Sequence, residues 1–227
     1  MPQQFVEPVT RASGACTRAV VMVLHGGRAD SCEPSRPWHL SAVRMVPFAR
    51  ALHSELGDQG VAVWSVRYRY RGWNGAAASP VDDARNALER VRAAHGDVPV
   101  VLLGHSMGAR TALRVCDDPS VVGVVALAPW LPPGEPVRVR GRLVHLAHGT
   151  ADRWTDPAGT HAWAERARSE ASELVVTDVP QGGHFMLSDI VTWNRLARDG
   201  VVAGLRAALG ALDGAPLDPS EPPGGSE

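Results

Sequence analysis

The sequence lacks several features that mark large classes of proteins. It has only three cysteines, Cys16, Cys32 and Cys116, which are too few and too widely spaced for a disulfide framework or a metal knuckle. No apolar run approaches the ~20 residues that cross a bilayer, and the first residues have neither the basic nor the apolar region of a secretory signal. We therefore expect reduced thiols, a cytoplasmic location and no membrane partner.

The sequence also has no excess of positive or negative charge. The formal net charge is −1, from 23 basic and 24 acidic residues, and no basic stripe stands out, so no nucleic-acid partner is expected. No metal-ligand cluster or nucleotide-binding loop is apparent, so we predict no metal and no cofactor. The 227 residues, 44% hydrophobic and 21% charged, suffice for one soluble globular domain.

Short apolar runs and helix-compatible segments alternate along the chain. This alternation predicts a doubly wound, predominantly parallel sheet with helices on both faces. We expect one domain over 19–210, an N-terminal arm over 1–18 that could supply one edge strand, and a disordered tail over 211–227. The expected strands are 20–24, 61–66, 100–103, 121–127, 143–147 and 174–177, and the expected helices are 41–57, 80–94, 107–117, 157–171 and 187–209.

Residues 104–108 carry the most informative motif, Gly-His-Ser-Met-Gly, directly after an apolar run. A G-x-S-x-G turn between a strand and a helix is typical of a nucleophile elbow, which exposes the serine above the end of a sheet. A chain of this composition would contain the pattern by chance roughly 0.1 times, and the alternative is a glycine-rich turn of an ordinary α/β domain. The motif makes Ser106 the candidate nucleophile.

A serine nucleophile needs a base, and the base needs an orienting group. Polar residues that follow the carboxyl ends of parallel strands meet at one edge of the sheet. His184, in a Gly-Gly-His loop after the last predicted strand, is the candidate base. Asp152, after the fifth strand, is the favoured acid, and Asp156 is its rival. Asp156 is also well placed to cap the helix that begins near residue 157.

Acyl transfer also needs backbone donors for a tetrahedral oxyanion. The amide of Met107, directly after the serine, is one candidate. The second should come from the turn after the first buried strand, from either Gly27 or Arg28, and the residues alone do not choose between them.

Two further groups of residues could contact a substrate. Trp38, Trp73 and Trp130, with Trp154, lie in connecting loops and are candidate apolar walls, although ordinary packing would also explain each of them. Three arginines at period two, at positions 67, 69 and 71, follow the second buried strand. They could line an anion site, or they could be solvated surface charge.

The order of these motifs, 104–108, then 149–152, then 183–184, resembles the α/β-hydrolase superfamily over roughly residues 19–210. The resemblance implies that superfamily's fold and a Ser-Asp-His triad in this chain order. The sequence departs from the family pattern in its short or missing N-terminal strands. Residues 131–140 are too few for a cap domain, and Arg28 stands where a glycine-rich oxyanion loop would have another glycine.

The function expected from these residues is hydrolysis of a small-molecule carboxylic ester or thioester through an acyl-enzyme. Two alternatives stay open. The same triad serves acyltransferases and peptidases, and the same scaffold could bind a ligand without turning it over. The substrate and the oligomeric state are not specified by the sequence.

Overall fold

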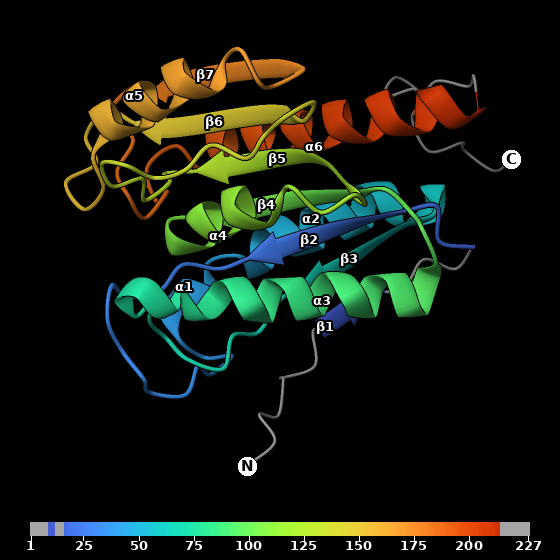
Figure 1. The fold of residues 1–227 in the computed structure, drawn as a ribbon, viewed down its shortest axis with the longest axis horizontal. Coiled ribbons are helices and arrows are strands. Elements are labelled where there is room, and N and C mark those ends of the chain that lie inside the picture. Colours follow the sequence, from blue (N-terminus) through green and yellow to red (C-terminus); the bar gives the residue numbers. More distant parts are fainter. Residues whose placement is uncertain (1–8, 12–15, 214–227) are drawn as a thin grey trace, which may run out of the picture.

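A seven-stranded sheet forms the centre of the molecule (Figure 1). The computed structural model describes residues 9–11 and 16–213, and the strand order is β1-β3-β2-β4-β5-β6-β7. Strands β2 to β7 are parallel, whereas β1 pairs antiparallel with β3. The predicted sheet is confirmed. Its strands are β1 (Val9–Arg11), β2 (Ala19–Leu24), β3 (Val61–Ser65), β4 (Val100–His105), β5 (Val121–Leu127), β6 (Leu143–Gly149) and β7 (Glu173–Val179).

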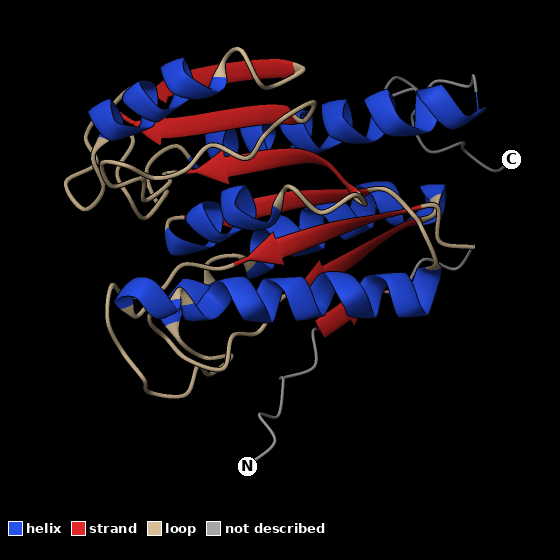
Figure 2. Ribbon diagram, in the orientation of Figure 1, coloured by secondary structure: helices blue, strands red, loops and turns tan. Residues whose placement is uncertain are grey.

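Helices cover both faces of the sheet (Figure 2). On one face of the sheet, buried side chains of α3, α4 and α5 pack against the strands to form one core. On the other face, buried side chains of α2 and α6 form a second core. The helices are α1 (Leu40–Val43), α2 (Val46–Leu56), α3 (Ser79–His95), α4 (Met107–Val115), α5 (Pro157–Ala167) and α6 (Ile190–Asp213), with short 3₁₀ turns at Gly57–Gln59 and Gly75–Ala77.

Burial on both faces of the sheet explains why the sequences of the central strands are continuously apolar. In β2 all six residues are buried, and successive side chains point to opposite cores. Val20 and Met22 lie in the core under α3 and α4, whereas Val21 and Val23 lie in the core under α2 and α6. Each such side chain stabilises the fold by about 1.5–3 kcal/mol when it leaves water.

Three predicted helices differ from the observed ones by more than two residues. The expected helix over 157–171 ends at Ala167. The expected helix over 41–57 is divided into α1 and α2, because Pro47 has no N–H with which to continue the hydrogen-bond ladder to Val43. The expected helix over 187–209 begins at Ile190. It starts there because the Asp189 carboxylate accepts from the Thr192 amide (3.2 Å) and caps the first turn.

The ends of the chain and the β5–β6 connection complete the fold. Residues 9–11 of the expected arm form the edge strand β1, and α6 continues to Asp213, past the expected start of the tail at 211. The rest of that tail, 214–227, lies outside the described residues, as do 1–8 and 12–15. Residues 128–142 contain no helix or strand, so the connection after β5 carries no cap domain. None of the helices in the described ranges has the length and apolar character needed to span a membrane.

Candidate active site

Ser106 occupies the turn between β4 and α4 in a backbone conformation that few residues adopt. Its φ is 56° and its ψ is −118°, a conformation that costs about 1–3 kcal/mol for a residue with a side chain. The turn is held from both sides: the Ser106 amide donates to the Leu127 carbonyl (3.0 Å), and the Ser106 carbonyl accepts from the Arg110 amide (3.1 Å). Ser106 is therefore fixed at the carboxyl end of the central strand.

The two glycines of the motif permit this turn. A Cβ atom on Gly104 would lie 2.5 Å from the carbonyl oxygen of Gly108. A Cβ on Gly108 would collide with the backbone of Leu24 and His25, at the end of β2. Helix α4 can approach both strands this closely only because neither position has a side chain, which is the physical content of the G-x-S-x-G pattern.

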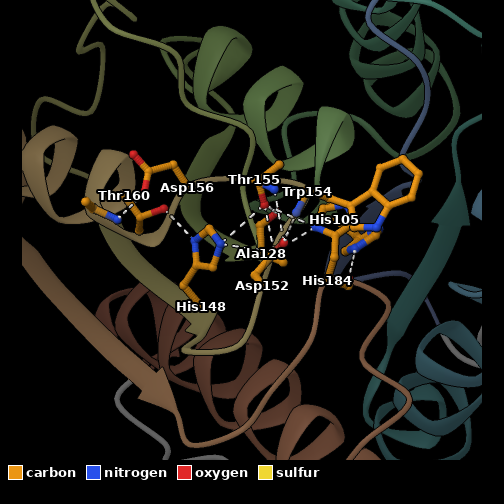
Figure 3. A network of polar contacts seen from close by, with 10 residues as sticks. His105, Ala128, His148, Asp152, Trp154, Thr155, Asp156, Thr160 and His184 are labelled. Atoms are coloured by element: carbon orange, nitrogen blue, oxygen red, sulfur yellow. Dashed lines mark hydrogen bonds and ion pairs between the residues drawn. The ribbon is translucent and has the colours of Figure 1, made fainter.

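Asp152 and His184 come together because the loops after β6 and β7 touch through glycines. A Cβ on Gly149 would collide with the backbone of Gly182, and the Ala151 amide donates to the Gly182 carbonyl (3.0 Å). Across this contact the His184 Nδ1–H donates to Asp152 Oδ2, at 2.8 Å (Figure 3). The Nδ1 nitrogen is thus occupied, and Nε2 is the nitrogen of His184 that can act on a substrate.

The Asp152 carboxylate is fully buried and receives several donors. Its Oδ1 accepts from the amides of Trp154 (2.7 Å) and Thr155 (3.0 Å), and its Oδ2 accepts from the Thr155 hydroxyl (2.8 Å). Burial raises the pKa of Asp152, but the hydrogen bonds from the Thr155 and Trp154 amides, together with those from the His184 and Thr155 side chains, outweigh burial and hold the pKa below its usual range. The carboxylate is charged at neutral pH.

A second histidine binds the same carboxylate oxygen. His148 is fully buried, its Nε2 lies 3.1 Å from Asp152 Oδ2, and its Nδ1 lies 2.7 Å from the Thr160 hydroxyl (Figure 3). Burial lowers the pKa of His148, so its ring is neutral at neutral pH. These partners assign the proton to Nε2, which donates to the carboxylate, while Nδ1 accepts from Thr160. His148 therefore fixes the orientation of the Asp152 carboxylate.

His105, next to the serine, positions the base loop. Its Nε2–H donates to the backbone carbonyl of His184 (2.9 Å), and the two rings lie 5.0 Å apart. Burial lowers the pKa of His105 to about 3, so the ring stays neutral. Sequence reasoning did not assign roles to His105, His148 or Thr155. For His148, its place at a strand end four residues before Asp152 was the available signal.

The turn after β2 distinguishes the two candidate oxyanion donors. The Arg28 amide donates to the Arg71 carbonyl (2.9 Å), so it is already engaged. Gly27 packs so closely on the Met107 side chain and the Arg71 carbonyl that a Cβ there would collide with both. Gly27 thus lies beside Met107, the first residue of α4.

Ser106 and His184 line one cavity of about 600 Å³, together with Gly27. The ring of Trp154 stacks on that of His184, with an interplanar angle of 20°. The cavity's large apolar side chains are Trp38, Leu40, Trp154, Phe185 and Leu187, and its arginines are Arg28, Arg44 and Arg71.

Among the predicted tryptophan walls, Trp38 and Trp154 line this cavity, but Trp73 and Trp130 do not. Trp73 is only 3% exposed and meets Trp130 edge to face. The Arg110 guanidinium lies 3.8 Å from the centre of the Trp73 ring and is paired with the buried carboxylate of Glu135. The prediction of Trp73 as a substrate wall is thus corrected, because its buried ring packs against this ion pair. Trp130 is half-buried and lines a neighbouring cavity that also includes Trp154, so its role as a substrate wall stays a prediction.

The remaining candidates have structural roles. Asp156, the rival acid, accepts from the Ala158 amide (2.9 Å) and caps α5, as a helix N-cap does. Cys116 is buried, and burial raises the pKa of its thiol to about 12, whereas Cys16 and Cys32 are exposed. Across the described ranges, no three His, Cys, Asp or Glu side chains converge to hold a metal ion.

The comparisons with known proteins agree with this fold. The model of the alpha/beta hydrolase family matches residues 20–166. This chain therefore belongs to the alpha/beta hydrolase family. A search among curated proteins returned no significant match.

Solved structures show the same fold at low sequence identity. A serine hydrolase homologue from Coxiella burnetii is 15% identical with a TM-score of 0.64, covering 85% of this chain and 90% of that chain. A serine hydrolase without a lid from Xanthomonas campestris is 20% identical with a TM-score of 0.62, and the match covers 88% of this chain and 95% of that chain. A thermophilic esterase from Thermogutta terrifontis, solved with butyrate bound, is 15% identical with a TM-score of 0.63, covering 86% and 88%.

Proposed function

We propose that this protein hydrolyses carboxylic esters or thioesters of small molecules through a covalent acyl-enzyme. The observation that carries the proposal is the joint geometry of three residues. Ser106 stands on a strained elbow, His184 lines the same cavity, and the Nδ1 nitrogen of His184 is 2.8 Å from the buried carboxylate of Asp152. Family membership and the esterase among the similar structures support the same reaction class.

Each residue of the triad has a defined part in the proposed reaction. The Ser106 hydroxyl oxygen attacks the acyl carbon while His184 Nε2 accepts its proton. Asp152 holds the imidazole tautomer and stabilises the imidazolium that forms. The amides of Met107 and Gly27 donate to the tetrahedral oxyanion, Gly27 being preferred because the Arg28 amide is engaged.

Collapse of this intermediate breaks the bond to the alcohol or thiol, which takes the proton back from His184. Water then attacks the acyl carbon while losing a proton to His184. The second intermediate collapses by breaking the bond to the Ser106 oxygen, which takes that proton back from His184 as the acid is released. Water as the acceptor distinguishes this proposal from acyl transfer.

Labelling with a fluorophosphonate tests the proposal most directly, because the reagent reacts with an activated serine. We expect one adduct per chain, located on Ser106 by peptide mass spectrometry and absent from Ser106→Ala. We also expect para-nitrophenyl acetate and butyrate to be hydrolysed, with loss of the activity in the same variant. A folded protein that neither labels nor hydrolyses these esters would contradict the assignment.

A further inference from the structure

The cavity at Ser106 is cationic. Three arginines, Arg28, Arg44 and Arg71, are among its lining residues, and no aspartate or glutamate is among them. Of the three, Arg71 is neutralised from outside the lining, because its guanidinium donates to the Glu33 carboxylate at 2.5 Å. In the described part of the chain neither Arg28 nor Arg44 makes such an ion pair, although the Glu33 carboxylate also attracts the charge of Arg28.

Arg44 is the better placed of these two arginines to bind an anion, because it is half-buried whereas Arg28 is exposed. Arg44 directly follows α1, is half-buried, and its guanidinium lies 4.7 Å from the centre of the Phe185 ring, next to the proposed base. Its Nε atom is buried and has no hydrogen-bond partner among the described residues. Burial lowers the pKa of Arg44, because withdrawing the charged guanidinium from water is electrostatically unfavourable.

A half-buried guanidinium without an anion is a costly arrangement that a bound anion relieves. Arginine is also the side chain best suited to bind carboxylate or phosphate, because its planar donors match two oxygens at once. Arg28 is exposed at the same cavity, beside the Gly26–Gly27 turn, and can contact the same anion.

Several large apolar side chains also line the cavity and are open to solvent. Trp38, Leu40, Trp154 and Leu187 are between 68% and 76% exposed, an unusual concentration of large apolar side chains around one cavity. Such a group favours a ligand with an apolar part that covers them.

Building on the proposed hydrolase function, we propose that the substrate is an ester or thioester that carries a negatively charged group, carboxylate or phosphate, bound by Arg44 with help from Arg28. The apolar part of the same substrate packs on Trp38, Leu40, Trp154 and Leu187. The cationic wall selects among esters, whereas the triad and oxyanion amides act on the ester bond common to all of them.

Matched ester pairs test the proposal. On the acyl side, para-nitrophenyl hemiglutarate, which is anionic, is compared with para-nitrophenyl pentanoate, which has the same chain length and no charge. On the leaving-group side, para-acetoxybenzoate is compared with its methyl ester. We expect kcat/KM to favour the anionic member of at least one pair by about tenfold, and the preference to shrink as salt is added. The favoured pair identifies the side of the scissile bond that carries the charge.

Three variants connect that preference to the cavity. Arg44→Met keeps an apolar stem against Phe185 and should reduce the anionic-to-neutral ratio about tenfold, while Arg44→Lys should retain part of it. Arg50→Met removes an exposed arginine of α2 that does not line the cavity, and should leave the ratio unchanged. Equal hydrolysis of both members of each pair by the wild type, or an unchanged ratio in Arg44→Met, would overturn the proposal.

Binding separates this inference from the proposed function. If no ester is hydrolysed, the function has failed, and the Ser106→Ala variant is titrated with monobutyl glutarate and, separately, dibutyl glutarate, with tryptophan fluorescence as the signal. Tighter binding of the anion, weakened by Arg44→Met, would uphold the anion site. Equal binding of the two compounds would refute it.

Discussion

Replacement of Asp152 by asparagine removes the charge at the centre of the site without changing the size of the side chain. Oδ1 of Asp152 accepts from two backbone amides, those of Trp154 and Thr155. Only an oxygen can accept there, so in Asp152→Asn the amide NH₂ must take the place of Oδ2 and face His184. Two donors would then meet, unless the proton of His184 moves from Nδ1 to Nε2.

That tautomer is the wrong one for the reaction, because a protonated Nε2 cannot accept the proton of Ser106. Loss of the orienting carboxylate in a Ser-His-Asp triad lowers kcat about 10⁴-fold, and we expect a loss of that order here. The assay is hydrolysis of para-nitrophenyl butyrate together with the rate of fluorophosphonate labelling. Circular dichroism and urea denaturation of each variant check that the protein is folded.

Asp156→Asn is the matched control, since it makes the same chemical change four residues away. Asp156 caps α5 through the Ala158 amide, a role that asparagine also fills, so kcat should stay within about twofold of the wild type. A folded Asp152→Asn variant that keeps more than a tenth of the wild-type kcat would refute the reasoning. A larger loss in Asp156→Asn than in Asp152→Asn would move the acid to Asp156.

Three other predictions concern stability and the elbow. Burial lowers the pKa of His25 to about 4 and that of His105 to about 3, so below the unfolded value of ~6.5 the unfolded chain binds more protons. The free energy of unfolding, measured by urea titration, should therefore decrease as the pH is lowered from about 6 to about 4.5, by about 2 kcal/mol per pH unit; a flat profile would contradict the burial. Gly104→Ala should slow fluorophosphonate labelling at least about tenfold, because its Cβ meets the backbone of α4, and wild-type labelling would refute this. Glu135→Gln should lower the free energy of unfolding by about 3 kcal/mol, measured in urea, while labelling persists in the folded protein.

The sheet was predictable because its central strands are buried on both faces. A strand such as β4 has no polar side to interrupt its sequence, so Val100–Leu103 reads as one apolar run followed by the glycine motif. The boundaries of α1 and α2 were not predicted, because apolar periodicity continues through Pro47 while the backbone ladder does not. Apolar periodicity indicates which face of a helix is buried, whereas the break between α1 and α2 depends on the backbone N–H that Pro47 lacks.

The contacts of the site depend on distances that sequence spacing does not encode. Trp73 was predicted as a substrate wall, but its ring is held by Arg110, which pairs with Glu135 from the β5–β6 connection. Likewise, the choice between Gly27 and Arg28 rested on a hydrogen bond from Arg28 to Arg71, some forty positions along the chain. Both contacts depend on how the loops pack over the end of the sheet, and no local sequence pattern predicts them.

Three histidines meet at the carboxyl end of the sheet, and their surroundings limit which of them can serve as base. His105 commits Nε2 to the His184 carbonyl, and with a pKa of about 3 its ring is too weak a base near neutral pH. His148 has both ring nitrogens engaged, by Asp152 and Thr160, and it is not among the residues that line the cavity. His184 alone combines Nδ1 on the carboxylate with a place on the cavity wall. The two buried neutral rings thus hold the acid and the base loop in place, and the proton transfer that we propose falls to His184.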